Sequence, residues 1–156
     1  MAKLKMGNMR LRSKSFESHG RIADRYSGYG ENVSPALEWT DAPKGTKSFA
    51  LICHDPDAPL PRGFTHWVIY GIPGSANGIS EGGGKAFKEG VNDAGKPGYF
   101  GPMPPAGHGP HHYYFWLYAL DNDVDLRPGA DREKCLSAIE NHVIEQSRLI
   151  GTYQKE

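Results

Sequence analysis

Residues 113–120 read YYFWLYAL, an unbroken apolar stretch that is rich in aromatic side chains. Aromatic residues favour strands, and the stretch contains neither glycine nor proline. Residues 48–53 (SFALIC) and 66–72 (HWVIYGI) are similarly apolar, and each stretch stops at turn-forming residues. The three stretches predict central strands that are buried on both faces.

Additional, less regular strand patterns lie at residues 11–16, 36–39 and 85–91, each bounded by glycine, proline, asparagine or aspartate. Together with the central strands, they favour an architecture in which one sheet packs on another. The sequence therefore predicts a mainly β protein, with a large central sheet, a smaller sheet and long loops rich in proline and glycine.

A helical pattern occurs only near the C-terminus. Asp131 is suited to cap a helix there. Leu136, Ile139, Val143 and Ile150 follow at helical spacing. The pattern predicts a C-terminal amphipathic α-helix that ends at Gly151, with its apolar side packed on a sheet.

The composition indicates an ordinary globular protein. The 156 residues include 18 basic and 18 acidic side chains, so the formal net charge is zero. This balance argues against a nucleic-acid-binding domain and against a polybasic membrane anchor. With 38% hydrophobic residues, the chain is expected to form a single domain over residues 1–156, and its 20 glycines and 12 prolines predict many turns.

The sequence also predicts the cellular location of the protein and the redox state of its two thiols. The N-terminal residues lack the apolar stretch of a signal peptide, and no apolar run has the length of a membrane span. A cytoplasmic location is therefore expected. Cys53 and Cys135 each lie in an apolar segment and are predicted to be buried free thiols, with a disulfide as the less favoured alternative.

Two polar loops next to the predicted central strands hold the residues best suited to chemistry. The first, residues 55–61 (DPDAPLP), places Asp55 and Asp57 in a backbone stiffened by prolines. The second, residues 98–113, reads GYFGPMPPAGHGPHHY. Its glycines allow backbone amides to approach a ligand, and its prolines hold the shape of the loop. A binding site is therefore expected where these loops meet.

Five of the seven histidines cluster in or beside these loops, namely His54, His66, His108, His111 and His112. A loop histidine taken alone is more often solvated or bound to the backbone, and His54 and His112 are assigned to that class. His66 and His111 differ because each stands at the mouth of an apolar strand. We expect these two rings to face a pocket.

Several other chemistries are less favoured than simple binding. Asp55, His66 and His111 could form a metal site of two histidines and one carboxylate, which would make the protein an enzyme. The sequence has no G-x-S-x-G, and Cys53 lies in an apolar strand where inert packing is the default. Residues 82–85 (GGGK) lack the serine or threonine of a nucleotide-binding loop. The aromatic run could stack on bases, but the neutral charge favours core packing.

These segments resemble the phosphatidylethanolamine-binding protein family, which includes Raf kinase inhibitor protein and a bacterial and archaeal branch. The family carries a D-P-D-A-P segment, a strand that begins with histidine, and a G-x-x-P-P segment leading to H-x-Y, here residues 55–59, 66–68 and 101–113. Residues 32–39 are similar to the family's N-terminal portion, and residues 151–153 to the ending of its bacterial branch. The resemblance covers essentially the whole chain.

The resemblance implies a large central sheet, a smaller sheet, and a pocket at the sheet end that accepts phosphate-like anions and phospholipid head groups. The ligand-binding residues that match are Asp55, Asp57, His66, Gly101, Pro102, Pro105, His111 and Tyr113. His112 stands where many eukaryotic members have arginine, so the role of that cation does not transfer. The chain is also shorter than the eukaryotic members, and their kinase-regulating role is not carried over.

A phosphate group needs donors, which His66, His111, the Tyr113 hydroxyl and backbone amides of the glycine-rich loop would supply. Asp55 would repel an anion unless it is protonated, holds a histidine in its charged form, or meets the ammonium of a zwitterion, and the last two alternatives are favoured. Asp57 has an alternative role in an Asx-type turn. We therefore expect binding of a phosphate or phosphoethanolamine-like molecule, without catalysis and without a cofactor.

A second hypothesis belongs to a different class of function. The protein would inhibit or regulate a kinase or a protease through the rim of the pocket, with the small ligand as a modulator. The resemblance to the family's bacterial branch also allows a homodimer.

Overall fold

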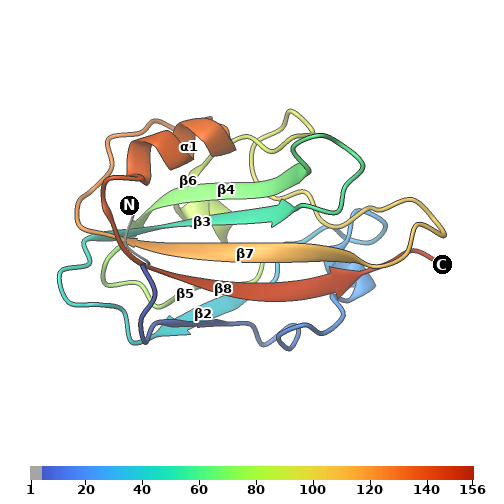
Figure 1. Cartoon of the computed structure of the whole chain (residues 1–156), viewed down its shortest axis with the longest axis horizontal. Helices are drawn as coiled ribbons and strands as arrows, with labels where there is room; N and C mark the ends of the chain where they lie inside the picture. Colours follow the sequence, from blue (N-terminus) through green and yellow to red (C-terminus); the bar gives the residue numbers. More distant parts are fainter. Residues whose placement is uncertain (1–4) are drawn as a thin grey trace.

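The computed structural model describes residues 5–156, which form two antiparallel sheets and one α-helix (Figure 1). The large sheet has the strand order β6-β4-β3-β7-β8, and the small sheet has the order β1-β2-β5. The strands are β1 (Arg10–Arg12), β2 (Leu37–Thr40), β3 (Ser48–Asp55), β4 (Phe64–Pro73), β5 (Gly78–Ile79), β6 (Lys88–Glu89), β7 (His111–Leu120) and β8 (Val143–Tyr153). The helix α1 spans Arg132–Ile139, and two short 3-10 turns span Asp24–Tyr26 (η1) and Gly84–Ala86 (η2). The predicted fold class is confirmed.

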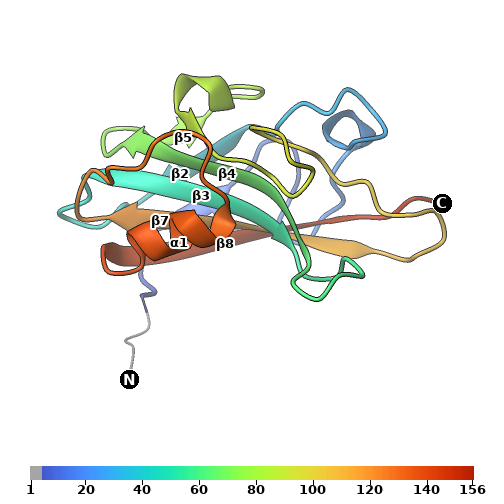
Figure 2. The ribbon, with the colours of Figure 1, turned by 90° about the horizontal axis from the view of Figure 1, so that it is seen from above.

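The central strands β3 and β4 are buried on both faces, as their apolar sequences predict. One face of the large sheet packs against the small sheet, where Trp39 lies against Phe49 with ring centroids 5.1 Å apart. The other face is covered at β3 and β4 by α1, through Cys135 and Ile139. Figure 2 shows α1 on one side of the large sheet and β2 and β5 on the other.

Strand β7 alternates between two environments, which differs from the prediction that both of its faces are buried. Tyr113 and Phe115 lie in the core between the two sheets. Tyr114 and Trp116 are only half-buried on the opposite face, where their rings stack and Arg148 of β8 lies over both. The reason is that the cluster around α1 reaches β7 only at its C-terminal end, through Tyr118 and Leu120, and leaves Tyr114 and Trp116 uncovered.

The predicted C-terminal helix is correct at its start and wrong at its end. Asp131 caps α1 by accepting a backbone hydrogen bond in the first turn. The helix ends at Ile139, and the predicted continuation to Gly151 belongs to strand β8 instead, including Val143 and Ile150. β8 pairs with β7 along its length. This pairing satisfies the backbone groups of an otherwise open edge, and it overrides the local helical spacing.

The three less regular strand patterns are confirmed in part. Residues 36–39 correspond to β2, which is shifted by one residue. Residues 11–16 contribute only their start to β1, and residues 85–91 contain the last two residues of η2 and the two-residue strand β6. Short edge strands have few pairing partners, so the local pattern defines their ends poorly.

The N-terminal segment, residues 5–22, lies along the outer edge of β8. The Gln146 N–H donates to the Lys5 carbonyl at 2.7 Å, and the His19 N–H donates to the Ile150 carbonyl at 2.6 Å. At the opposite edge of the large sheet, β6 is two residues long. One edge of the large sheet is therefore covered and the other is short.

Cys53 and Cys135 are buried free thiols, as predicted. Burial raises the pKa of Cys53 well above its ordinary value and raises the pKa of Cys135 to about 12, so both thiols keep their protons at neutral pH. Within residues 5–156, no helix has the length and apolar character needed to cross a membrane.

Candidate functional site

The two polar loops meet at one end of the large sheet, close to the C-terminus (Figure 1). One loop follows β3 and the other precedes β7, and these strands are neighbours. The loops enclose a pocket of about 240 Å³. Its polar lining consists of Asp55, His66, His111 and Tyr113, and its apolar lining consists of Ala58, Pro59, Leu60, Phe64, Phe100, Met103, Pro104 and Pro105. Five of the eight predicted site residues therefore lie together.

Asp55 and His111 form a buried pair at the base of the pocket. The His111 Nδ1–H donates to the Asp55 Oδ2 at 2.7 Å, and both side chains are almost fully buried. The second carboxylate oxygen of Asp55 accepts the Asp57 N–H at 2.7 Å, which closes a turn at the end of β3. The Asx-type turn is therefore made by the Asp55 side chain, not by Asp57. Both oxygens of the buried carboxylate have partners within the protein.

The other ring nitrogen of His111 is also occupied. His111 Nε2 lies 2.6 Å from Nδ1 of His108, an exposed residue of the loop that precedes β7. A contact of this length between two ring nitrogens holds one proton, donated by one ring and accepted by the other. Asp55, His111 and His108 thus form a hydrogen-bonded chain from the base of the pocket to its surface.

His66 is held as a neutral ring. Its Nδ1–H donates to the Phe100 carbonyl at 2.6 Å, and the Phe64 ring lies against it with centroids 4.7 Å apart. Burial lowers the pKa of His66 to about 4. With Nδ1 protonated, Nε2 carries the lone pair, so His66 is a hydrogen-bond acceptor at neutral pH.

Tyr113 supplies a hydroxyl donor beside these rings. Its ring meets His66 edge-on, with centroids 5.1 Å apart. Burial and the nearby Asp55 carboxylate raise the pKa of the Tyr113 hydroxyl above its ordinary value. The phenol therefore keeps its proton and is able to donate to an anion.

Gly101 and Pro102 shape the loop from behind and lie outside the pocket lining. The Gly101 N–H donates to the Asn32 side chain at 2.6 Å, and the Pro102 carbonyl accepts the Gly28 N–H at 2.8 Å. A Cβ on Gly101 would lie 2.1 Å from the Tyr26 carbonyl oxygen, so only glycine fits there. The Gly101 amide therefore positions the loop and is not free for a ligand, contrary to the sequence-based expectation.

Asp57 lies outside the pocket as well, and it is paired with His112 on the opposite side of β7. Its carboxylate accepts from His112 Nδ1 at 2.6 Å and from the His112 N–H at 2.7 Å. Partial burial raises the pKa of Asp57, but the hydrogen bonds from His112 outweigh this effect and leave it below its ordinary value. The two aspartates of the DPD segment thus bind consecutive histidines, one inside the pocket and one at the surface.

The model of the phosphatidylethanolamine-binding protein family matches residues 12–154. The chain belongs to this family. A Methanothermobacter thermautotrophicus relative, a UPF0098 protein, is 46% identical and covers 94% of this chain and 99% of its own. The crystal structure of CT736 from Chlamydia trachomatis, a homologue in the same family, has a TM-score of 0.89 and 36% identity, and covers 95% of this chain and 98% of its own. LppC of Mycobacterium tuberculosis, whose name describes a lipoprotein, is 40% identical and covers 92% of this chain and 71% of its own.

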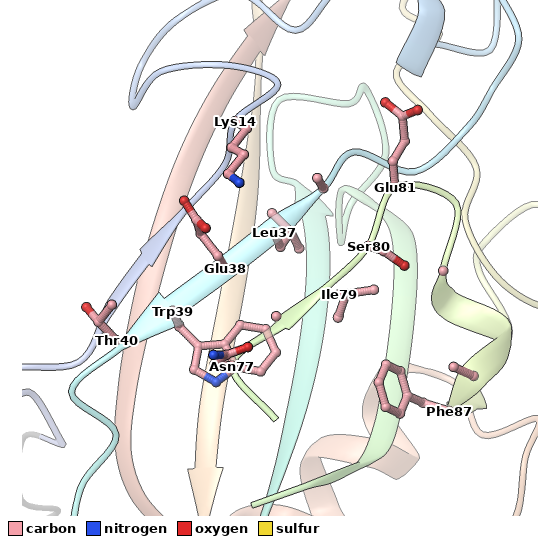
Figure 3. A pocket seen from close by; sticks show the side chains of 14 residues that line it. Lys14, Leu37, Glu38, Trp39, Thr40, Asn77, Ile79, Ser80, Glu81 and Phe87 are labelled. Atoms are coloured by element: carbon pink, nitrogen blue, oxygen red, sulfur yellow. The ribbon is translucent and has the colours of Figure 1, made fainter. Parts of the chain in front are cut away.

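A larger groove of about 680 Å³ lies beside β2 and β5 (Figure 3). Lys14 and Glu38 stand on one side of it and Phe87 on another (Figure 3). Its other carboxylate, Glu81, is already bound by Arg25 at 2.8 Å. Buried titratable side chains do not converge there, whereas they do in the smaller pocket.

The alternative of a metal triad is not supported by the geometry. Asp55 and His111 bind each other, and the Nδ1 of His66 is used by the Phe100 carbonyl. Among residues 5–156, no group of three or more His, Cys, Asp or Glu residues is arranged to hold a metal ion.

Two residues of the site were missed by the sequence analysis. His108 contacts His111, and the only sequence feature that pointed to His108 was its place in the cluster of five histidines. Asn32 has a left-handed backbone, with φ at 59°, and accepts the Gly101 N–H. Its signal was its position in residues 32–39, which resemble the phosphatidylethanolamine-binding protein family, but no local pattern indicates a partner so distant in the chain.

Proposed function

We propose that this protein binds a phosphate-containing head group in the pocket of about 240 Å³ and catalyses no reaction. The observation that carries the proposal is the convergence of Asp55, His66, His111 and Tyr113 at the base of an otherwise apolar pocket. A small concave site with few, well-placed polar groups is typical of ligand binding.

The charges of the site suit a zwitterionic ligand. The Tyr113 hydroxyl would donate to the phosphate, and an adjacent ammonium would be attracted by the Asp55 carboxylate and the His66 lone pair. Phosphoethanolamine carries both groups in one small molecule, and it is therefore the first ligand to test.

A second candidate function is regulation of a protein partner, a kinase or a protease, through the pocket rim. Leu60 and Met103 favour it, because these apolar side chains are 53% and 45% exposed at the mouth of the pocket. A ligand in the pocket would then displace the partner. A cytoplasmic location stays a prediction, to be tested by cell fractionation, since the name of one relative describes a lipoprotein.

Head-group binding is tested by an amide-NMR titration of the whole protein with phosphoethanolamine. We expect saturable shifts around Asp55, His66, His111 and Tyr113. His111→Asn retains a donor toward Asp55 but removes the other ring nitrogen, and should weaken binding. His112→Ala is the matched control, because His112 is the next residue but faces away from the pocket. An absence of shifts at millimolar ligand would reject the proposal and favour the regulatory candidate.

A further inference from the structure

The pocket as it stands has more acceptors than donors, which is unsuited to an anion. The Asp55 carboxylate is negative, and His66 faces the pocket with an acceptor because its Nδ1–H is bound to Phe100. The prolines of the rim have no N–H. The glycine-rich loop contributes little, since the Gly101 and Gly107 amides donate to Asn32 and to the Lys155 carbonyl.

The Tyr113 hydroxyl is a ready donor, but it carries no charge. A positive charge must come from a ring that gains a proton when the anion binds. His66 resists this proton, because burial lowers its pKa to about 4. His111 is placed to accept it, since its Nδ1–H points at the Asp55 carboxylate, which stabilises an imidazolium.

We propose that His111 and His108 act as a proton-linked anion receptor, in which binding of a phosphate group is coupled to uptake of one proton by this pair. This inference rests on the proposed head-group binding and adds His108 as a binding residue. The ligand class is a phosphate monoester or phosphodiester, and the shared phosphate is what the pair recognises.

The contact between the two rings fixes the number of protons. His111 Nε2 and His108 Nδ1 lie 2.6 Å apart, so one proton lies between them. When Nε2 of His108, the outer nitrogen, carries no proton, the pair is neutral. When this nitrogen is protonated, the pair carries one positive charge. A further proton would place two N–H groups against each other and break the contact. The pair therefore takes up one proton while the contact is kept.

The surroundings of the pair allow this uptake. The titratable groups that face the His111–His108 pair are Asp55 on β3, His66 on β4, Tyr113 on β7 and Tyr153 on β8. Asp57 and His112 lie on the other side of β7, and Lys155 lies beside the loop that precedes β7. Lys155 Nζ lies 5.2 Å from the centre of the Tyr29 ring, so it is engaged there. Gly107 and Gly109 flank His108 with φ at 74° and 83°, a backbone conformation that glycine adopts readily.

Calorimetry of the whole protein with glycerophosphoethanolamine measures the proton directly. This phosphodiester does not titrate between pH 6 and pH 8, so heats in two buffers of different ionisation enthalpy report protons taken up by the protein. We expect about one proton, and an affinity that rises up to about tenfold for each pH unit lowered. Phosphoethanolamine in a parallel arm distinguishes the sources, since tighter binding of the diester indicates a lipid head group and tighter binding of the monoester a soluble metabolite.

Three variants locate the proton. His111→Asn should abolish both the proton uptake and the pH dependence. His108→Ala should weaken binding at pH 7 by about three- to tenfold, the range expected for one exposed hydrogen bond to a charged ring, and should move the pH profile to lower pH. His112→Ala should behave as the native protein. Thermal melting of each variant checks that it is folded.

The outcomes separate this inference from the proposed function. Binding without proton uptake, or uptake that persists in His111→Asn, would overturn the proton-linked receptor and leave head-group binding intact. Binding that weakens as the pH falls would indicate that the ammonium dominates, and would also overturn it. If neither probe binds at any pH, the proposed function fails and this inference fails with it.

Discussion

The last residue of β3, Asp55, and the first residue of β7, His111, are joined by a buried hydrogen bond of 2.7 Å between Oδ2 and Nδ1. The bond joins two neighbouring strands at the point where both loops of the pocket leave the sheet. The same pair therefore contributes to the stability of the fold and to the chemistry of the pocket.

Removing one member of this pair should be costly. Asp55→Ala leaves His111 and the Asp57 N–H without their acceptor, and we expect a loss of about 3–5 kcal/mol in the free energy of unfolding. Asp55→Asn retains an acceptor and should lose less. Urea unfolding at pH 7 measures both. A loss below about 1 kcal/mol for Asp55→Ala would show that the buried carboxylate is not balanced by His111.

The neutral ring of His66 makes stability depend on pH. Its pKa is about 4 in the folded protein against 6.5 as the ordinary value, so below pH 6.5 the unfolded chain binds a proton that the folded chain does not. The free energy of unfolding should therefore fall as the pH is lowered from 6.5 to 4, by about 3 kcal/mol from this residue. His66→Asn keeps a donor toward the Phe100 carbonyl and should remove this part of the slope. Equal slopes for the two proteins would contradict the prediction.

Gly101→Ala should disturb the loop more than Gly107→Ala. The added Cβ at Gly101 would lie 2.1 Å from the Tyr26 carbonyl oxygen, so the loop must move and the bond to Asn32 is strained. We expect a loss of about 1–3 kcal/mol and weaker phosphoethanolamine binding. Gly107 meets open space, and its φ of 74° costs an alanine about 1–2 kcal/mol. Binding is the decisive readout, because Gly107→Ala should retain it.

The two thiols should be unreactive in the folded protein. Cys53 and Cys135 are buried, and burial raises the pKa of each. At pH 8, a colourless disulfide reagent that releases a coloured thiolate should give no signal with native protein and two equivalents in urea, one for each cysteine. Rapid labelling of one thiol without urea would show that its segment opens readily.

The features that depend on local composition were the ones best predicted from the sequence. The apolar runs of β3 and β4 mark strands covered on both faces, and Asp131 marks the start of α1. The end of α1 was missed because β8 is a strand by virtue of pairing with β7, which local spacing does not record. Asp57 was assigned to the pocket because it matches the family's D-P-D-A-P segment, but the turn at the end of β3 directs it to His112.

In the candidate site, too, the sequence predicted some features, and others become visible only in the folded chain. The family resemblance identified Asp55, His66, Pro105, His111 and Tyr113, which line the pocket. It did not indicate that the loop amides are already used. Gly101 binds Asn32, although 69 residues separate them, and such a contact exists only once the chain has folded.

The N-terminal segment that lies along β8 has a consequence for self-association. Through the hydrogen bonds of Lys5 with Gln146 and of His19 with Ile150, the segment occupies backbone groups of β8 that would otherwise be free to pair with a strand of another molecule. Strand β6, at the far edge, offers only two residues for such pairing. In a homodimer of this protein, the large sheet would thus not continue from one subunit into the next.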